Sequence, residues 1–572
     1  MKNNMKFKFG VLALAISSVL FTGCADDGDD GAVGPAGPAG QDGQDGVNGE
    51  DLTAVAKLIR IATVPLGAEI TGIYKTDNGE LFFNVQHPDD ALPAPENNAA
   101  VGVWNGVDFD NFDPRTQDLP VPAADSAEAQ TVQVFAGEYQ ALGRAEDTFG
   151  GALAFGLGAI VTADESAKIK QSQDPDFNAF IPANADGSQG YLFTAFEDRP
   201  GAMSRLMVSK ADNGTWNVDA ALNVDFSSVA GTMINCFGTV SPWGTPLTSE
   251  ENYEAENAAN WNNPAYSDGY PNYTDVQNIQ TYLGGTFPNP YDYGYIVEIT
   301  QPTEAAPVPV KQFTLGRVAH ENVVIMPDQK TVYITDDGTD KGFYKFVATT
   351  AGDLTAGTLY AAKLMQDATS DVSKAGFDIS WIALGSSNNT QIEGWINEYD
   401  GIDETDYVAD STSYITDAEI TDWAENGTGD DRYAFLETLK AAKAKGATTE
   451  FRKMEGININ YDGVASGTVP YMYVAMSAVE RGMADSEGDI QLQENRCGAV
   501  YRFGLDSSYN AIRMEPVVVG GQYDSSAVNR CATDSISNPD NLVVLDDGKV
   551  IIGEDTGNHV NNMMWVYNPE GK

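Results

Sequence analysis

A hairpin pattern that recurs along the chain constrains its fold more than any other feature of the sequence. Copies occur at residues 73–88 (IYKTDNGELFFNVQHP), 324–338 (VIMPDQKTVYITDDG) and 542–557 (LVVLDDGKVIIGEDTG), with a degenerate copy at 457–477. Each copy has an apolar run, a turn region that contains Asp, a second run rich in β-formers, and a polar end. The pattern predicts a two-stranded hairpin whose polar end lies at one rim of a sheet.

Repeated hairpins in a chain of 572 residues predict an all-β fold, and specifically a β-propeller of about six blades that direct loops toward a central axis. A β-sandwich with many insertions is the alternative. Helices are expected mainly as an insertion at about residues 405–447. Within it, Thr416 and Glu419 have the spacing of a capping box, and a run of helix formers ends at Gly446.

The N-terminus predicts export. Lysines precede an apolar run at residues 11–21 that is too short to span a membrane, which is typical of a cleaved signal peptide. LFTGC at residues 20–24 resembles a bacterial lipobox, so residues 1–24 are expected to be a lipoprotein signal peptide with Cys24 lipidated. Ala25 would follow that cysteine, which favours an outer-membrane lipoprotein on the periplasmic or cell-surface side. An ordinary secretory signal is the alternative.

A glycine stands at every third position from residue 28 to residue 49, which is the repeat of collagen. So short a tract is expected to serve as a solvated tether at residues 25–52, with trimerisation as the alternative. Residues 53–572 would then form the globular body. No later stretch is apolar enough to cross a bilayer, so the body would meet a membrane only through the lipid anchor.

The charge of the chain excludes some partners and favours others. A net charge of −50, from 83 acidic against 33 basic residues, repels nucleic acid and offers oxygen ligands to hard cations. The chain has only three histidines, His87, His320 and His559, and three cysteines besides Cys24, which are Cys236, Cys497 and Cys531. A zinc site built on several histidine ligands is therefore not expected. An oxidising compartment would pair two of the cysteines, and the third needs another explanation.

A set of ordered motifs resembles a known family. The motifs are NCFGTVSPWGTPLTSEEN at residues 235–252, LGRVAHENVVI at 315–325, VYITDDGTDKGFYKFV at 332–347, GTLYAAKL at 357–364, ATTEFRKMEGI at 447–457 and SNPDNLVVLDDGKVIIGEDT at 537–556. Together they resemble PhoX-type alkaline phosphatases, which are secreted phosphomonoesterases that depend on calcium and iron and have a propeller fold. The resemblance spans roughly residues 200–572. Residues 64–88 resemble a segment near that family's C-terminus, which implies a circular permutation. Residues 58–88 are then expected to lie in the same blade as residues 542–568.

The resemblance implies a cluster of ferric iron (Fe3+) and calcium (Ca2+) ions held by one thiolate and several carboxylates. Carried over by motif, the implied metal ligands are Cys236, Glu321, Asp540, Glu455 and, through the permuted segment, Glu69. Ferric iron accepts a thiolate and hard oxygen donors, and calcium takes oxygen ligands, so neither ion needs imidazole. With Cys236 on a metal, Cys497 and Cys531 would be left to form a disulfide.

The resemblance also implies direct phosphoryl transfer, in which several cations bind the phosphate oxygens and no protein nucleophile is needed. Lys453 stands where the family has a phosphate-binding arginine, with Arg452 beside it, so both are candidates for binding phosphate. Lysine offers a point charge rather than a bidentate fork. Two further departures are Ser249 in place of a cysteine and Pro246 in place of a tryptophan.

Seven other residues are candidates for lesser roles. His320 is expected to support Glu321 rather than to bind metal. The remaining six are either calcium ligands or structural residues at strand ends: Glu250, Glu251, Asp336, Asp337, Glu554 and Asp555.

The sequence therefore predicts a cell-envelope metallophosphatase that hydrolyses phosphate monoesters. The alternative is a non-catalytic calcium-binding propeller on a tether that serves surface adhesion or assembly. The natural phosphoester and the oligomeric state are left open.

Overall fold

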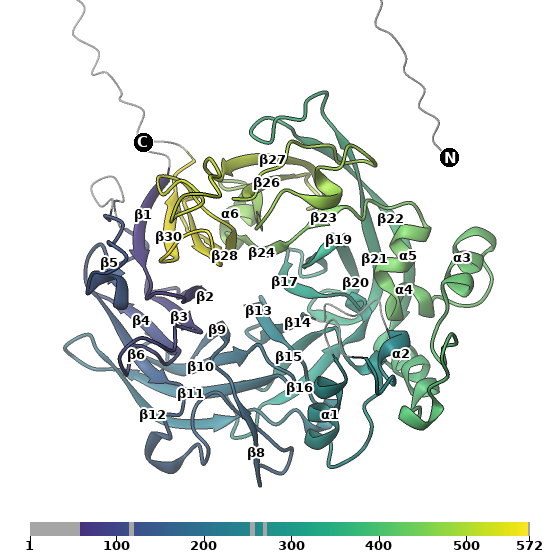
Figure 1. Ribbon diagram of the computed structural model, residues 1–572, viewed down its shortest axis with the longest axis horizontal. Helices are drawn as coiled ribbons and strands as arrows, with labels where there is room; N and C mark the ends of the chain where they lie inside the picture. The colour runs from purple at the N-terminus through teal and green to yellow at the C-terminus, as the bar shows by residue number, and fades with distance from the viewer. Residues whose placement is uncertain (1–57, 112, 114–118, 252–257, 267–271, 570–572) are drawn as a thin grey trace, which may run out of the picture. The chain divides into compact units, whose positions relative to one another are not determined.

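The computed structural model describes residues 58–569, apart from residues 112, 114–118, 252–257 and 267–271. The predicted signal peptide, the lipidated Cys24 and the tether at residues 25–52 lie outside the described residues. What is described is mainly β-structure built from antiparallel sheets, which Figure 1 shows arranged around a central axis like the blades of a propeller.

Each of the main sheets is a meander that starts at the axis. From the innermost strand outward, one sheet has β2 (Glu69–Lys75), β3 (Leu81–Gln86), β4 (Ala100–Asn105) and β6 (Glu138–Arg144). The next has β9 (Pro175–Pro182), β10 (Gln189–Phe196), β11 (Ala202–Lys210) and β12 (Trp216–Asn223). A third has β13 (Asn235–Val240), β14 (Pro246–Glu250), β15 (Ile296–Thr300) and β16 (Val308–Gln312).

Two further meanders are joined at their outer edges into one nine-stranded sheet. One of them has β17 (His320–Ile325), β18 (Thr331–Asp336), β20 (Phe343–Thr350) and β21 (Asp353–Gln366). The other has β24 (Met454–Ile459), β25 (Tyr471–Met476), β26 (Ala499–Leu505) and β27 (Ala511–Val519). The long strand β22 (Phe377–Asn388) pairs with β21 on one side and β27 on the other.

The sheet that contains the C-terminal strands also contains the first described strand. It runs from β28 (Pro539–Val544) through β29 (Val550–Glu554) and β30 (Met563–Tyr567) to β1 (Leu58–Thr63) and the short β5 (Gln133–Val134). Strand β1 pairs with β30, from Leu58 opposite Tyr567 to Thr63 opposite Met563. The two ends of the described chain are thereby joined in one sheet.

This arrangement corrects one prediction. We expected residues 58–88 to share a blade with residues 542–568, and only β1 does so, because β2 and β3 begin the neighbouring sheet. The chain turns between them at Pro65 and Gly67, where Gly67 has a φ of +74° that favours glycine. A circular permutation relative to the family remains a prediction.

The innermost strands form a closed ring. In order, β28, β2, β9, β13, β17 and β24 each contact the next, and β24 contacts β28 (Figure 1). Apolar clusters fill the space between neighbouring sheets, as where Phe82 of β3 packs on Phe180 of β9 and on Trp216 of β12. The inner strands are therefore held at fixed positions around the axis, and so are the side chains that they direct toward it.

The recurring sequence pattern forms the inner hairpins. The three clear copies become β2–β3, β17–β18 and β28–β29, each an antiparallel pair. The degenerate copy becomes β24–β25, where the helix α6 (Tyr461–Ser466) replaces the tight turn that we expected. In each pair, the start of the inner strand and the end of the second strand lie at the same rim of the sheet.

Two small sheets pair β7 (Ala159–Val161) with β8 (Lys168–Gln171) and β19 (Thr339–Lys341) with β23 (Phe451–Arg452).

The other described helices are α1 (Tyr273–Tyr282), α2 (Asn389–Ile396), α3 (Asp417–Asn426), α4 (Arg432–Leu436) and α5 (Thr438–Ala444). The helical insertion thus starts at α2, earlier than predicted. Thr416 caps α3 in a capping box with Glu419. The expected helix after residue 431 is divided at Glu437, whose carboxylate accepts a hydrogen bond from Tyr291. Among the described helices, none has the length and apolarity that crossing a membrane requires.

Cys497 and Cys531 form a disulfide with their Cα atoms 5.9 Å apart. It joins the loop before β26 to the loop before β28. Cys236 is buried and not part of a disulfide.

Candidate metal centre

Every strand of the inner ring starts with a side chain that can bind a metal ion. The residue is the first or second of its strand in each case: Glu69 of β2, Asp176 of β9, Cys236 of β13, Glu321 of β17, Glu455 of β24 and Asp540 of β28. Because the inner strands surround the axis at the same level, these side chains meet in one cavity, and all of them line it. Five of the six were predicted as ligands from the sequence. Asp176 was not.

A second set of carboxylates enters the same cavity from the second strands. Glu197 follows β10, Glu251 follows β14, Asp337 follows β18 and Asp555 follows β29. Each reaches the cavity because the hairpin brings the end of the second strand to the rim where the inner strand begins. The inner and second strands thus supply two sets of ligand-type side chains around the axis.

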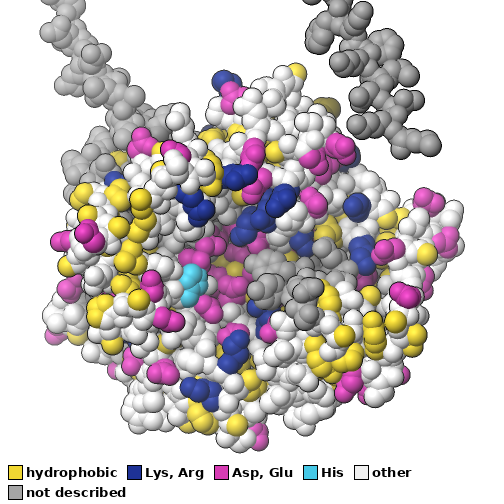
Figure 2. All heavy atoms as spheres, in the orientation of Figure 1, with side chains coloured by type: hydrophobic (Ala, Val, Ile, Leu, Met, Phe, Trp, Pro, Cys, Tyr) yellow, Lys and Arg dark blue, Asp and Glu magenta, His cyan; other side chains and the backbone are white. Residues whose placement is uncertain are grey.

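The cavity has a volume of about 290 Å³ and an acidic lining. Its remaining lining residues are Gln86, His87, Asp174, Arg199 and Lys453. Figure 2 shows the acidic side chains gathered in the central hollow, with a histidine and several Lys and Arg side chains around them. An acidic cavity of this size suits small cations better than an apolar ligand.

The potential ligand atoms lie close together in three overlapping groups. Asp176, Glu197 and Cys236 form one group, Cys236, Glu251 and Glu321 the second, and Glu321, Glu455 and Asp540 the third. Within each group, the ligand atoms lie within 4.8 Å of one another. Cys236 and Glu321 are each shared by two groups, so the groups together form a site for several neighbouring ions.

Burial makes this concentration of negative charge unfavourable in the absence of cations. Burial and the neighbouring Asp176 and Glu321 hold the pKa of the Cys236 thiol well above its usual value. Burial, with a further contribution from Glu197, raises the pKa of Asp176 to about 8. Burial likewise raises the pKa of Glu321 well above its usual value. These groups can all ionise together only if positive charge enters the cavity.

Several oxygen atoms in the cavity also lack hydrogen-bond donors. Among the described residues, Asp176 Oδ1, Glu251 Oε1 and Glu321 Oε1 are buried without a hydrogen-bond partner. A buried polar atom without a partner costs free energy, which a bound cation would recover. The donor set of one thiol and many carboxylates, the three groups and the unpaired oxygens together fit a metal site.

The acidic pairs at strand ends divide into one structural and one cavity residue each. Glu250 accepts hydrogen bonds from the backbone N–H groups of Met233 and Gly294 and pairs with Lys311 at 3.1 Å. Asp336 accepts from the backbone N–H groups of Ala319 and Gly342. The other members of these two pairs, Glu251 and Asp337, line the cavity.

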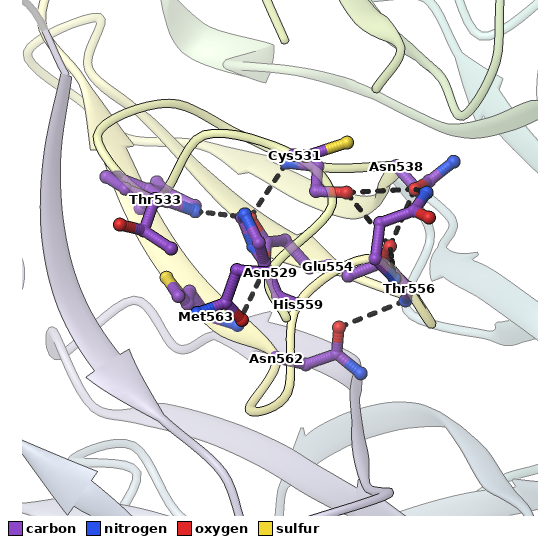
Figure 3. A network of polar contacts seen from close by, with 12 residues as sticks. Asn529, Cys531, Thr533, Asn538, Glu554, Thr556, His559, Asn562 and Met563 are labelled. Carbon is purple, nitrogen blue, oxygen red and sulfur yellow. Dashed lines mark hydrogen bonds and ion pairs between the residues drawn. The ribbon is translucent and has the colours of Figure 1, made fainter. Parts of the chain in front are cut away.

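The third pair repeats this division. Glu554 accepts hydrogen bonds from the backbone of Ser537, from Trp565 Nε1 and from His559 Nδ1, as Figure 3 shows for the histidine. Its neighbour Asp555 lines the cavity. In every pair the first acid therefore ties the end of the second strand to backbone near the start of the inner strand, and the second acid faces the axis.

The predicted phosphate-binding residues also separate. Lys453 lines the cavity, and its ammonium pairs with Glu455 Oε1 at 2.9 Å. Arg452 is not among the cavity-lining residues, and its Nη1 donates a hydrogen bond to the carbonyl of Gly338 at 3.2 Å. Since β23 pairs with β19 at Arg452, that side chain supports the strand pair.

His320 and Glu69 complete the predicted set. His320 is buried, its Nε2 bonds to the carbonyl of Gly316 at 2.8 Å, and burial lowers its pKa to about 4. That contact replaces the expected support of Glu321. Glu69 lies 2.7 Å from His87 Nε2, and burial and Asp555 raise the pKa of Glu69 well above its usual value.

The sequence analysis missed four charged residues of the cavity: Asp174, Asp176, Glu197 and Arg199. A signal for Asp176 was present. Pro175-Asp176-Phe177-Asn178 resembles the Pro539-Asp540-Asn541 start of β28, and both segments open an inner strand. The turn after β9 also contains Asp186-Gly187, so a second signal for this inner strand was present and was missed.

The fold and the site define a class, that of propeller-like β proteins with an acid-rich metal site on the axis. The family model described as alkaline phosphatase PhoX matches residues 194–572. The chain therefore belongs to the PhoX family of alkaline phosphatases, which are phosphoric monoester hydrolases. This membership supersedes the alternative of a non-catalytic binding module.

One solved structure supports the fold. Pseudomonas fluorescens PhoX, solved in complex with vanadate as a transition-state analogue, is 16% identical, with a TM-score of 0.50 over 90% of this chain and 88% of that one. A 6-phosphogluconolactonase-like protein from Bacteroides uniformis is 9% identical, with a TM-score of 0.25 over 68% of this chain and 80% of that one. The second similarity is too low to support an argument. A search of curated proteins finds no match.

Proposed function

We propose that the chain hydrolyses phosphate monoesters in the axial cavity, with Ca2+ and Fe3+ held by the residues that line it. One observation carries the proposal: each of the inner strands β2, β9, β13, β17, β24 and β28 places a ligand-type side chain at its start, and all of these line one cavity. Because these side chains are spread along the chain from Glu69 to Asp540, they meet in one cavity only when all six inner strands form the ring. We further propose that the meanders are the six blades of a propeller.

The donor types favour different ions at different places. The two groups that contain Cys236 combine a thiol with carboxylates, which suits Fe3+. The group of Glu321, Glu455 and Asp540 offers only oxygen, which suits Ca2+. When bound, such ions supply positive charge and Lewis acidity to the phosphoryl group at neutral pH.

The protein's own part is to position charges. Phosphoryl transfer requires little covalent chemistry from the protein, so the rigid ring and the cationic Lys453 would act by orienting the phosphate and balancing its charge. The backbone of Lys453 is fixed by its hydrogen bond to Gly338 at 2.8 Å. Its ammonium is shared with Glu455, which limits it to a point charge at one side of the cavity.

We also propose that the protein is exported as an outer-membrane lipoprotein anchored through Cys24. Its proposed binding partner is a phosphate monoester, and it is not proposed to bind nucleic acid. Labelling of the full chain with a fatty-acid analogue, and its loss in Cys24→Ala, would test the anchor. Label retained in that variant would contradict it.

The enzymatic proposal is tested with the purified full chain and p-nitrophenyl phosphate. We expect hydrolysis that is lost on chelation and restored by adding Ca2+ and Fe3+ together. Glu455→Gln should abolish it, whereas Glu515→Gln, a change on the outer strand β27, should leave it intact. Full activity in chelated protein would refute the metal-dependent function.

A further inference from the structure

Two of the cavity-lining side chains, Arg199 and Lys453, carry a permanent positive charge, and they come from opposite sides of the ring. Arg199 follows β10, in the sheet whose inner strand is β9, and Lys453 precedes β24. The inner strands succeed one another as β9, β13, β17 and β24 in one direction and as β9, β2, β28 and β24 in the other. Three steps separate the two sheets either way, so the cations flank the cavity from opposite sheets.

Lys453 is committed to neighbouring acids. Its ammonium lies 2.9 Å from Glu455 Oε1 and 3.8 Å from Asp337 Oδ2. Both carboxylates are buried, and both line the same cavity. A lysine in this position supplies charge, but it cannot hold two phosphate oxygens in one plane.

Arg199 is held differently. Its Nε pairs with Asp275 Oδ2 at 4.0 Å, and its backbone N–H donates to Asp198 Oδ1 at 2.7 Å. Asp275 is itself fixed in the capping box at the start of α1, where its carboxylate accepts from the backbone of Asn272. The side chain of Arg199 is only 14% exposed. Arg199 is thus oriented by a fixed acid.

Arg199 lies two residues after Glu197 in the chain, and both side chains line the cavity. Glu197 belongs to the ligand group of Asp176 and Cys236. The guanidinium therefore acts on the part of the cavity that contains the thiol, on the side away from Lys453.

We propose that Arg199 binds two non-bridging oxygens of the phosphoryl group through its guanidinium, and so supplies the fork that Lys453 cannot. A guanidinium presents parallel N–H donors that match phosphate oxygens, and such charge-assisted pairs are stronger than neutral hydrogen bonds. This inference rests on the proposed phosphatase function. It adds a substrate-binding residue that the sequence motifs did not indicate.

The test measures phosphate binding as well as turnover. The metal-loaded full chain is titrated with inorganic phosphate in a calorimeter, and KM and kcat are measured with p-nitrophenyl phosphate. We expect Arg199→Gln to weaken phosphate binding by about 10- to 100-fold and to raise KM by a similar factor. Arg199→Lys should recover part of the affinity. The matched control is Arg513→Gln. Arg513 lies on the outer strand β27, does not line the cavity, and pairs with Asp367.

Phosphate affinity of Arg199→Gln within twofold of the unaltered chain would overturn the inference while leaving the phosphatase function standing. Loss of bound metal from both Arg199 variants would also overturn it, because Arg199 would then be a structural support for Glu197. Failure of the unaltered chain to hydrolyse the ester, with phosphate binding still dependent on Arg199, would count against the proposed function alone.

Discussion

Cys236 Sγ lies 2.8 Å from Asp176 Oδ2, although the two residues are 60 positions apart in the chain and belong to neighbouring inner strands. The same sulfur lies 3.0 Å from Glu321 Oε2 on the other side. A thiol placed between two buried carboxylates can donate its proton to only one of them at a time. With a cation present, the thiolate and both carboxylates can serve together as ligands.

Asp176 should therefore be as important for metal binding as the ligands that the family motifs indicate. Replacing it, in Asp176→Asn, removes one charge from the group that contains Cys236, so we expect loss of iron and a fall in kcat/KM of at least about 100-fold. Elemental analysis and p-nitrophenyl phosphate turnover measure the two effects. Asp219→Asn, a change on the exposed outer strand β12, is the control. Unchanged iron in Asp176→Asn would remove Asp176 from the ligand set.

The members of an acidic pair should respond differently to the same substitution. Glu250→Gln leaves the ammonium of Lys311 buried without its carboxylate, which costs about 3–5 kcal/mol of folding free energy. We expect a large drop in denaturation midpoint for this variant. Glu251→Gln removes one of several mutually repelling buried charges, so it should lose metal without destabilising the metal-free protein. Equal losses of stability in the two variants would contradict the division of the pair.

This division shows where sequence reasoning stops. The hairpin pattern and the motifs located five of the six inner strands and the ligand-type residue of each, because strand starts and turns have local signatures. Whether Glu250 or Glu251 faces the axis depends on strand register, and a shift of one residue exchanges the two faces. The role proposed for Arg199 depends on two sheets that face each other across the ring. A local sequence pattern carries no information about that arrangement.

The buried pair of His559 and Glu554 should make stability depend on pH. Burial alone would lower the pKa of His559, but Glu554, whose Oε2 lies 2.9 Å from His559 Nδ1, raises it above the usual value (Figure 3). A histidine with a raised pKa in the folded state stabilises the fold fully below its unfolded pKa of about 6.5, and this contribution is lost as the pH rises through the folded pKa.

The pH effect is measured by chemical denaturation between about pH 5 and pH 9. We expect the unaltered chain to lose stability across the upper part of this range relative to His559→Gln. The same pH dependence in both proteins would show that the ion pair does not contribute.

The disulfide should stabilise the loops that precede β26 and β28. It links residues that are 34 positions apart, and a loop of that size predicts a contribution of about 3–4 kcal/mol. Cys497→Ser with Cys531→Ser should lower the denaturation midpoint and increase proteolysis at residues 520–538. The midpoint of the unaltered chain should fall to that of the double variant on reduction. No difference between oxidised and reduced protein would contradict this role.

The central claim is that the strands of the inner ring bind iron and calcium together, with Cys236 as a ligand to iron. The most direct measurement is the iron and calcium content of the purified full chain and of Cys236→Ser. We expect both metals in the unaltered chain and a loss of iron from Cys236→Ser, with calcium retained. Iron absent from the unaltered chain after growth and purification in iron-replete medium, or present in equal amounts in both proteins, would contradict the account.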